Sequence, residues 1–453
     1  MGSSSGNKYS LTEGGILRKL IFIAAPIMGT QFMQMAYNFT DMFWLGRVGS
    51  DAVAASGAAG MYMWLSFGFL LIGRMGAEIG VAQFLGRGDK RAAREFSQNA
   101  MVIALVLGTG FGLAMILFKR ELAGFFNFRE LPVAENTADY LSIVGCSMPV
   151  TFIAAVAAGS YNASGNSRTP FLLHGVGLIV NVVLDPLFIL TFNGGVRGAA
   201  IATVISQFIS SGLLIIALFF FKDRPFERYS FRIRPDTKKL LLIMKWAVPI
   251  GLESILFCFL SMVTSRLEAS FGANVVAASK VGSQIESFSW LIGGGFGSAL
   301  VVFIGQNYGA GKWERIRRGV RISAVAMTVW GILVSLFLYF GGGFLFALFL
   351  PGPELLKLGI PYLRILAFCQ LPMNLEAVGA GAFKGAGRTV PPSLVSIISN
   401  ILKPLLAFVL SKTGLGLYGI WVAVSVTAVL RGVWICLWYI LSGKKGLPAD
   451  SAS

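Results

Sequence analysis

Long apolar stretches separated by short polar segments recur along the whole 453-residue chain, which is 55% hydrophobic and 13% charged. A helix needs about 20 mostly apolar residues to cross the hydrocarbon core of a bilayer, and the sequence offers about twelve such stretches. We therefore predict an all-α polytopic membrane protein. The expected spans lie near residues 17–46, 52–85, 97–118, 137–158, 170–192, 198–221, 240–270, 275–305, 320–350, 358–382, 390–411 and 416–442.

The pattern also repeats within the chain. AAPIMG (24–29) matches AVPIGL (247–252), and QFLGRGDK (83–90) matches QNYGAGKW (306–313). Three residue pairs share one spacing of 223 residues: Pro26 and Pro249, Val53 and Val276, and Gln83 and Gln306. We therefore predict two pseudo-symmetric six-helix bundles around a central cavity, which is a recurrent plan of transporters.

This repeat gives the expected domain boundaries. They are an N-terminal tail at 1–15, whose first residues could be an expression remnant; a first lobe with helices 1–6 at 16–221; a basic cytoplasmic linker at 222–239; a second lobe with helices 7–12 at 240–442; and a C-terminal tail at 443–453.

The formal net charge of +17 comes largely from the segments between spans. One alternating set of loops, which includes those near Lys90 and Lys312 and the linker, is rich in Lys and Arg, and the other set is poorer. By the positive-inside rule the rich loops are cytoplasmic, so we expect both termini inside and a prokaryotic inner (plasma) membrane. Topology and attraction to anionic lipid account for the charge, and we predict no nucleic-acid partner.

The chemistry of catalysis is poorly represented. The chain has no GxxxxGK[ST] motif for nucleotide phosphates, and its one histidine, His174, lies beside a predicted span. We therefore expect neither an ATP-driven pump on a single chain nor an enzyme, and no cofactor.

Two carboxylates stand out because they lie alone inside apolar stretches, Asp41 in MAYNFTDMFWLG and Asp185 in VNVVLDPLFIL. A carboxylate near the bilayer centre costs roughly 2.5–3.5 kcal/mol on insertion scales, so it persists mainly where it handles ions or protons. In the repeat, Asp41 aligns with Thr264, and Asp185-Pro186 aligns with Lys403-Pro404. The acids thus belong to a site of the first lobe; the alternative is that they only accept hydrogen bonds from neighbouring Asn or Thr groups.

At these residues the chain resembles the multidrug and toxic compound extrusion (MATE) family, in particular its DinF-like branch. The segments that carry this resemblance are P-x(14)-D through Pro26 and Asp41, the loop GRGDKRAARE, the elements Asn181-x-x-x-Asp185-Pro186 and Thr203, and GQNYGAGKWE in the second half. The resemblance covers essentially the whole chain. It implies a secondary active exporter that exchanges organic, often cationic, compounds for H+ or Na+ by alternating access.

The resemblance also implies a cation-coupling set at Asp41, Asn181, Asp185 and Thr203, with Tyr140 nearby. Two carboxylates close together in a low-dielectric pocket should not both stay ionised, which suits a proton. The same four side chains could instead hold Na+, and no other metal is expected. Pro26 should kink the first helix, either permanently or as a hinge that the charge on Asp41 biases.

The second lobe offers Glu253 on the seventh span and Glu376 on the tenth as candidates for a second coupling site. An acid on the seventh span resembles the sodium-coupled and eukaryotic branches of the family, whereas Glu376 is about one helical turn from the family position. Among the other intramembrane charges, Arg74 and Glu78 should pair with each other, and Glu268 should reach the membrane interface.

Aromatic rings and flexible methionines suit broad binding of flat or cationic compounds. The candidates for substrate contact are Gln34, Met33, Tyr37, Phe257, Met262, Gln284 and Trp290. We expect a monomer whose partners are organic cations or amphipathic small molecules and membrane lipid. The alternative function is a flippase for a lipid-linked or amphipathic endogenous molecule; an intramembrane enzyme or channel has no support in the sequence.

Overall fold

The computed structural model describes residues 9–128, 130–227, 229–230, 235–349 and 352–443. Within these ranges the regular structure is helical and contains no strand. Ten helices are long and apolar enough to cross a membrane, and two bent helix pairs bring the number to twelve if each pair is one span. The predicted all-α fold is confirmed. Residues 1–8 and 444–453 of the two predicted tails lie outside the described residues.

The first half of the chain forms eight α-helices and one π-helical segment. They are α1 (Ile16–Val48), α2 (Ser50–Gly86), α3 (Lys90–Leu117), α4 (Lys119–Gly124), α5 (Leu131–Gly145), α6 (Met148–Ala163), α7 (Arg168–Pro186), η1 (Leu187–Thr191) and α8 (Gly195–Phe220). Where we predicted one span near 137–158, α5 and α6 meet at an angle of 52°. Pro149 in the first turn of α6 explains the break, because proline has no N–H to continue the helical hydrogen bonds.

The second half forms the helices α9 (Thr237–Ala269), α10 (Ala273–Gly309), α11 (Trp313–Phe349), α12 (Pro353–Ala367), α13 (Gln370–Gly385), α14 (Val390–Ser411) and α15 (Leu417–Gly443). Here α12 and α13 form the second bent pair, at 46°, with Pro372 in the first turn of α13. The broken span therefore occurs at the same place in each half, as the repeat requires.

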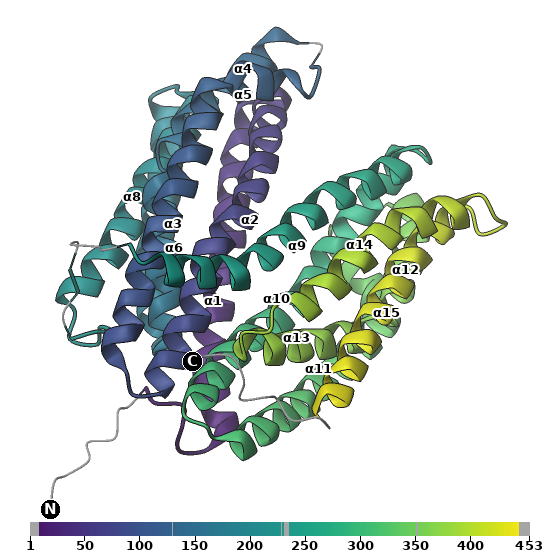
Figure 1. Ribbon diagram of the computed structural model, residues 1–453. Helices are drawn as coiled ribbons and strands as arrows, with labels where there is room; N and C mark the ends of the chain where they lie inside the picture. Colours follow the sequence, from purple (N-terminus) through teal and green to yellow (C-terminus); the bar gives the residue numbers. More distant parts are fainter. Residues whose placement is uncertain (1–8, 129, 228, 231–234, 350–351, 444–453) are drawn as a thin grey trace, which may run out of the picture.

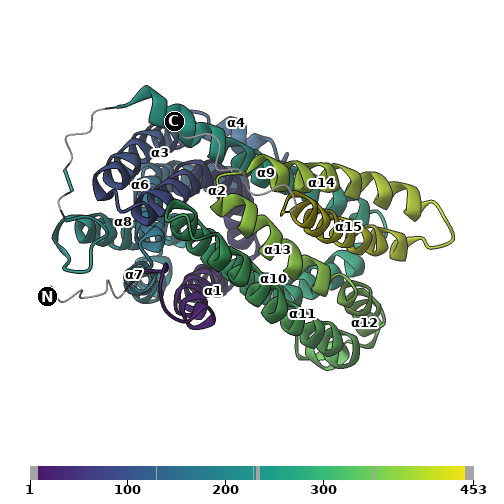
Figure 2. The ribbon, with the colours of Figure 1, turned by 60° about the horizontal axis from the view of Figure 1, so that its bottom comes forward.

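The helices form two bundles, which we call the first bundle (α1–α8) and the second bundle (α9–α15). Figure 1 shows them converging at the bottom of the view and spreading apart toward the top, and Figure 2 shows α1, α2, α9 and α10 between the two sets. The first half of α1 packs into the second bundle through Leu20, Ile23 and Ile27. In the same way the first half of α9 packs into the first bundle through Ile243 and Ala247.

At the converging end, which we call the closed end, the backbones of α2 and α10 touch. A Cβ placed on Gly86 would lie 2.0 Å from the carbonyl oxygen of Gln306, and one placed on Gly309 would lie 1.9 Å from that of Gln83. Only glycine allows so close an approach, since real Cβ contacts are never this short. The predicted repeat relates Gly86 to Gly309 and Gln83 to Gln306, so this contact is itself pseudo-symmetric.

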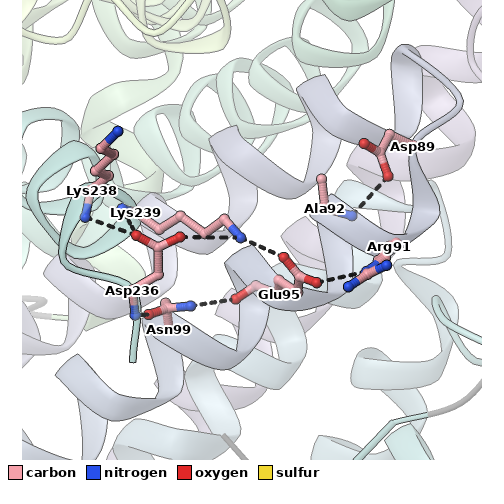
Figure 3. A network of polar contacts seen from close by, with 8 residues as sticks. All are labelled: Asp89, Arg91, Ala92, Glu95, Asn99, Asp236, Lys238 and Lys239. Carbon is pink, nitrogen blue, oxygen red and sulfur yellow. Dashed lines mark hydrogen bonds and ion pairs between the residues drawn. The ribbon is translucent and has the colours of Figure 1, made fainter. Parts of the chain in front are cut away.

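The start of α9 is fixed to the first bundle by polar contacts near the closed end (Figure 3). Asp236 caps α9 by accepting hydrogen bonds from the backbone N–H groups of Lys238 and Lys239. The Lys239 ammonium pairs with Glu95 on α3, and the Asn99 side-chain oxygen accepts a hydrogen bond of 2.8 Å from the Asp236 N–H. The end of the predicted basic linker is thus anchored on α3.

Candidate functional site

The two lone acids lie on helices that pack side by side in the first bundle. Asp41 lies in the second half of α1, and Asp185 lies in the last turn of α7. Pro186 follows at once, and the chain continues as the π-helical segment η1. Proline and π-helical geometry interrupt regular helical hydrogen bonding, and such interruptions are frequent at functional sites.

The predicted set Asp41, Asn181, Asp185, Thr203 and Tyr140 converges, and we call it the acid-pair site. The carboxyl groups of Asp41 and Asp185 lie within hydrogen-bonding reach of each other. The Asn181 amide nitrogen donates to Asp185 Oδ1 at 2.8 Å and to Asp41 Oδ1 at a longer 3.4 Å. The Thr203 hydroxyl donates to Asp41 Oδ2 at 3.4 Å and interacts with the Tyr140 hydroxyl.

Two oxygen atoms of this site have no partner in the described structure. Asp185 Oδ2 and Asn181 Oδ1 are both buried, and no described side chain donates a hydrogen bond to either. Both residues have a relative exposure of 0%. A buried acceptor that is left unpaired costs about 1–3 kcal/mol, and both of these atoms are acceptors that a proton donor or a cation would satisfy.

Tyr37, which we predicted to contact substrate, lies beside the acid-pair site. Asp41 and Asp185 lie close enough to its hydroxyl to interact with it electrostatically. A Cβ on Gly177 would lie 2.6 Å from the Tyr37 hydroxyl, so the absence of a side chain on α7 makes room for this ring. One helical turn earlier on α1, Met33 lies against Gly175 of α7, where a Cβ would lie 3.2 Å from the Met33 methyl carbon.

The other substrate candidates lie on α1 and on two helices of the second bundle. Gln34, Phe257 and Trp290 are exposed, and Met262 and Gln284 are half-buried. Within the described chain, no hydrogen bond or ring contact joins any of the seven candidates to another. Near these candidates, an aromatic contact between the bundles joins Phe32 on α1 and Phe288 on α10, whose ring centroids lie 5.7 Å apart.

The second-lobe candidates Glu253 and Glu376 each have a basic partner. Glu376 accepts a hydrogen bond of 2.6 Å from the Arg431 Nε on α15. Glu253 lies 3.6 Å from the Lys384 ammonium and accepts a hydrogen bond of 2.9 Å from Ser393. The two carboxylates are therefore neutralised by side chains of the protein, unlike Asp41 and Asp185.

Two further acids inside the predicted spans are Glu78 and Glu268. Arg74 and Glu78 pair as predicted, with Nε and Oε2 at 3.6 Å. The prediction that Glu268 reaches the membrane interface is wrong. Its side chain is buried, and it accepts a hydrogen bond of 3.2 Å from the Trp421 indole. The indole N–H and the nearby Ser279 hydroxyl supply an alternative to water that the sequence did not reveal.

Pro26 lies inside α1, which continues as one helix from Ile16 to Val48. The Thr30 hydroxyl donates to the Pro26 carbonyl oxygen at 3.0 Å, which adds a side-chain hydrogen bond beside the proline. Among the described residues no three His, Cys, Asp or Glu side chains gather in a metal-binding group.

Sequence reasoning missed the role of two glutamines. Gln83 and Gln306 served only to fix the register of the repeat, yet both are buried at the closed end. The Gln83 amide donates to the Gly385 carbonyl oxygen at 3.1 Å, and the Gln306 amide donates to that of Ala163 at 2.7 Å. Each glutamine reaches from one bundle to the last residue of a helix in the other bundle. Their repeat relation was the signal that could have indicated this.

A known family model matches the chain twice, once in each half of the repeat. The MatE family model matches residues 26–187 and again residues 249–409, which together are well over half of the chain. The two matches begin at the two prolines that define the repeat, Pro26 and Pro249.

Two relatives and one solved structure are similar over nearly the whole length. The probable multidrug resistance protein NorM of Thermotoga maritima is 26% identical over 435 residues, 95% of this chain and 93% of the relative. The FAD transporter of Shewanella oneidensis is 25% identical over 450 residues, 94% of this chain and 95% of the relative. A structure described as the outward-facing conformation of a multidrug resistance MATE family transporter of the MOP superfamily has a TM-score of 0.91 at 20% identity, and covers 99% of this chain and 100% of that chain. At this identity the structural match shows the fold.

Proposed function

Because this chain belongs to the MatE family of multidrug efflux transporters, we propose that it is a secondary active exporter that exchanges organic, often cationic, compounds for H+ or Na+. In this proposal the acid-pair site binds the coupling cation, and substrate and cation bind in turn as the protein alternates between two conformations. The membrane is the inner membrane of a prokaryotic cell, with both termini in the cytoplasm.

One observation carries the proposal: two carboxylates lie together inside an apolar bundle without a basic partner. Every other acid discussed above has a Lys, an Arg or a Trp N–H beside it, whereas Asp41 and Asp185 have only the amide of Asn181 and the hydroxyl of Thr203. Two negative charges in such a site require a cation, because a buried charge that is not paired is costly.

The orientation of the donors favours a proton as the coupling ion in this conformation. Asn181 presents its NH2 group, not its oxygen, to the two carboxylates, so the amide already acts as a donor. A proton on Asp185 completes this arrangement, because it converts an unpaired acceptor into a donor. A sodium ion prefers oxygen ligands, and Asn181 would offer its oxygen to an ion held between the two carboxylates only if the amide were reversed. Efflux driven by a Na+ gradient alone would contradict this preference.

The contacts at the closed end supply a gate for alternating access. Ala163 and Gly385 are the last residues of α6 and α13, where helix carbonyl groups lack partners within the helix. Gln306 and Gln83 donate to these carbonyl groups from the opposite bundle. Opening this end requires both hydrogen bonds to break, and the positive-inside rule puts this end on the cytoplasmic side. The described conformation is then closed to the cytoplasm.

The gate predicts that replacing Gln83 and Gln306 with methionine weakens the closed end. Each change leaves a buried carbonyl group unpaired, at about 1–3 kcal/mol, and Gln306→Met also removes the acceptor of the Leu11 N–H. Because the two glutamines belong to one contact, their effects are not expected to add, but the double variant should exceed either single change. Spin labels at the exposed residues Arg91 and Arg318, in a cysteine-free background, would report a larger fraction of long distances. The control Gln207→Met removes a hydrogen bond to Ser147 within one bundle, and should leave the distances unchanged. Equal effects of both sets would exclude the gate.

Pro26 remains our proposed hinge in α1. Protonation of the acid-pair site should change the bend of this helix, because Asp41 lies on the same helix and its charge differs between the two states. Structures determined at acidic and at basic pH that contain the same α1 would remove this proposal.

The function is tested with the purified protein in liposomes. Efflux of a fluorescent organic cation, and separately of FAD because the Shewanella relative carries that name, is followed under an H+ gradient or a Na+ gradient. The proposal predicts accumulation against the substrate gradient in the presence of one of the ion gradients. If a folded protein moves neither substrate under either gradient, the flippase alternative takes its place, and transfer of labelled lipid between leaflets becomes the assay.

A further inference from the structure

Lys403 lies on α14 at the position that repeats Asp185 of α7, and a proline follows each residue. The repeat partner of Asp41, Thr264, is buried on α9 and donates to the Leu260 carbonyl oxygen at 3.0 Å. Where the first bundle has two carboxyl groups, the second bundle therefore has a hydroxyl and an ammonium. The sign of the charge is reversed between the two equivalent places.

The Lys403 ammonium contacts uncharged partners on α9. It donates to the Ser261 hydroxyl oxygen at 3.2 Å, and it lies 5.0 Å from the centroid of the Phe257 ring. Among the described residues, no carboxylate lies within ion-pair distance of this nitrogen. The cation is thus held in place by a hydrogen bond and an aromatic face, while its charge is free to act over a longer range.

Two acids without an ion pair interact electrostatically with this cation. Glu268 on α9 accepts a hydrogen bond from Trp421 at 3.2 Å, and Glu286 on α10 accepts one from Gln370 at 3.1 Å. Lys403 contributes to the electrostatics of both acids, in second place to the Ser279 and Trp421 hydrogen bonds at Glu268 and to Gln370 and Arg431 at Glu286. Arg431 on α15 also acts on Glu286 and Lys403, but it is already paired with Glu376. Lys403 is then the one cation of this cluster that is not committed to a direct ion pair.

We propose that the Lys403 ammonium is a built-in counter-ion of the second bundle, which takes the place that an exchangeable cation has in the acid-pair site. The inference rests on the proposed function, since it concerns the ion that this function moves. A covalently attached cation cannot leave during the transport cycle. The second bundle therefore needs no ion from solution, and only the acid-pair site contributes to coupling.

Removing the charge of Lys403 should change the ion-to-substrate ratio. If Lys403 is replaced by methionine, the buried Glu268 and the half-buried Glu286 both lose the charge of Lys403. Such a pair must take up a proton or a cation from solution, because a buried carboxylate without compensation is costly. Methionine keeps the length and flexibility of the lysine stem, so the change isolates the charge. A latent cation site should appear in the second bundle.

The first measurement is the coupling ratio, read in liposomes from the ion gradient at which net substrate flux reverses. We expect Lys403→Met to carry one cation more per substrate than the unchanged protein, and Lys403→Arg to keep the original ratio. The matched control is Lys412→Met, because Lys412 is an exposed lysine at the end of the same helix. An active Lys403→Met protein with an unchanged ratio would overturn the inference.

The second measurement does not depend on transport. In detergent at neutral pH without Na+, the infrared spectrum of Lys403→Met should gain a band of protonated carboxylic acid, which disappears when Glu268→Gln and Glu286→Gln are added. If this band appears while the unchanged protein shows no ion-driven efflux, the proposed function fails and the counter-ion assignment stands. No gain of the band would refute the assignment. If Lys403→Met folds poorly, added Glu268→Gln should raise its Tm, and no such compensation would also refute it.

Discussion

Asp185→Asn is expected to reduce uphill substrate efflux to the background of empty liposomes while leaving the protein folded. Asparagine has nearly the shape of aspartate and can still contact Asn181, but it cannot change its charge when a cation binds or leaves. The site then holds one carboxylate at most. Binding and release of the cation therefore no longer shift the protein between its two conformations by enough free energy to drive transport. Asp41→Asn should have the same effect, since both carboxylates share one site.

The measurement is initial efflux against a substrate gradient, with protein content and Tm recorded in parallel. Asp51→Asn is the matched control, because Asp51 is an exposed acid at the start of α2 and hydrogen-bonds only its neighbour Ser50 in the described structure. The control should retain the efflux of the unchanged protein. If Asp185→Asn retains more than half of the uphill efflux, the acid-pair site does not couple the ion.

A second large effect is expected from Gly309→Val, which should prevent the closed end from forming. The first carbon of the new side chain would meet the Gln83 carbonyl oxygen at 1.9 Å, and this backbone atom cannot move aside as the tip of a flexible side chain can. Overpacking typically costs about 1–3 kcal/mol. The closed conformation should therefore become roughly 5- to 150-fold less populated relative to the open one.

Distances between spin labels at Arg91 and Arg318 would show this change as a shift of most of the protein to the longer distance. Gly294→Ala on the same helix is the control, since a Cβ there meets no other atom within 4 Å. The repeat predicts that Gly86→Val acts in the same way, through the Gln306 carbonyl oxygen at 2.0 Å. Distances in Gly309→Val that match those of the control would contradict the role of the glycine contact.

The acid-pair site could be predicted because carboxylates are rare inside apolar, membrane-spanning stretches. Such a carboxylate is costly unless it has a function, so Asp41 and Asp185 could be assigned to one site before their distance was known. Resemblance to the MATE family supplied Asn181 and Thr203, and the structure brings all four side chains together. That they bind the coupling ion stays a prediction.

The partners of the second-lobe acids could not be predicted in the same way. Glu376 and Arg431 lie on different helices, and their contact depends on how α13 and α15 rotate about their own axes. Hydrophobic periodicity cannot define such rotation when a helix is apolar on most sides, because no single face is then marked as the buried one. Glu268 was misplaced for the same reason, because its contact with Trp421 depends on the packing of α9 against α15.

The contact between the bundles at the closed end could not be predicted, although its residues are visible in the repeat. Gln83, Gly86 and their repeats Gln306 and Gly309 were visible as matching letters, but a match shows only that two segments have the same local structure. Their function depends on how the two bundles face each other, which no local pattern contains. When a repeat places the same polar residue near the end of a span in both halves, the two residues should therefore be tested as contacts between the bundles.

Coupling through the acid-pair site is tested by recording substrate exit and ion entry simultaneously in the same liposomes, with the unchanged protein and with Asp41→Asn. Antiport through the acid-pair site predicts that the two fluxes rise together in a fixed ratio, and that both stop in the variant. Uphill substrate exit without entry of H+ or Na+, or coupled fluxes that persist in Asp41→Asn, would contradict it.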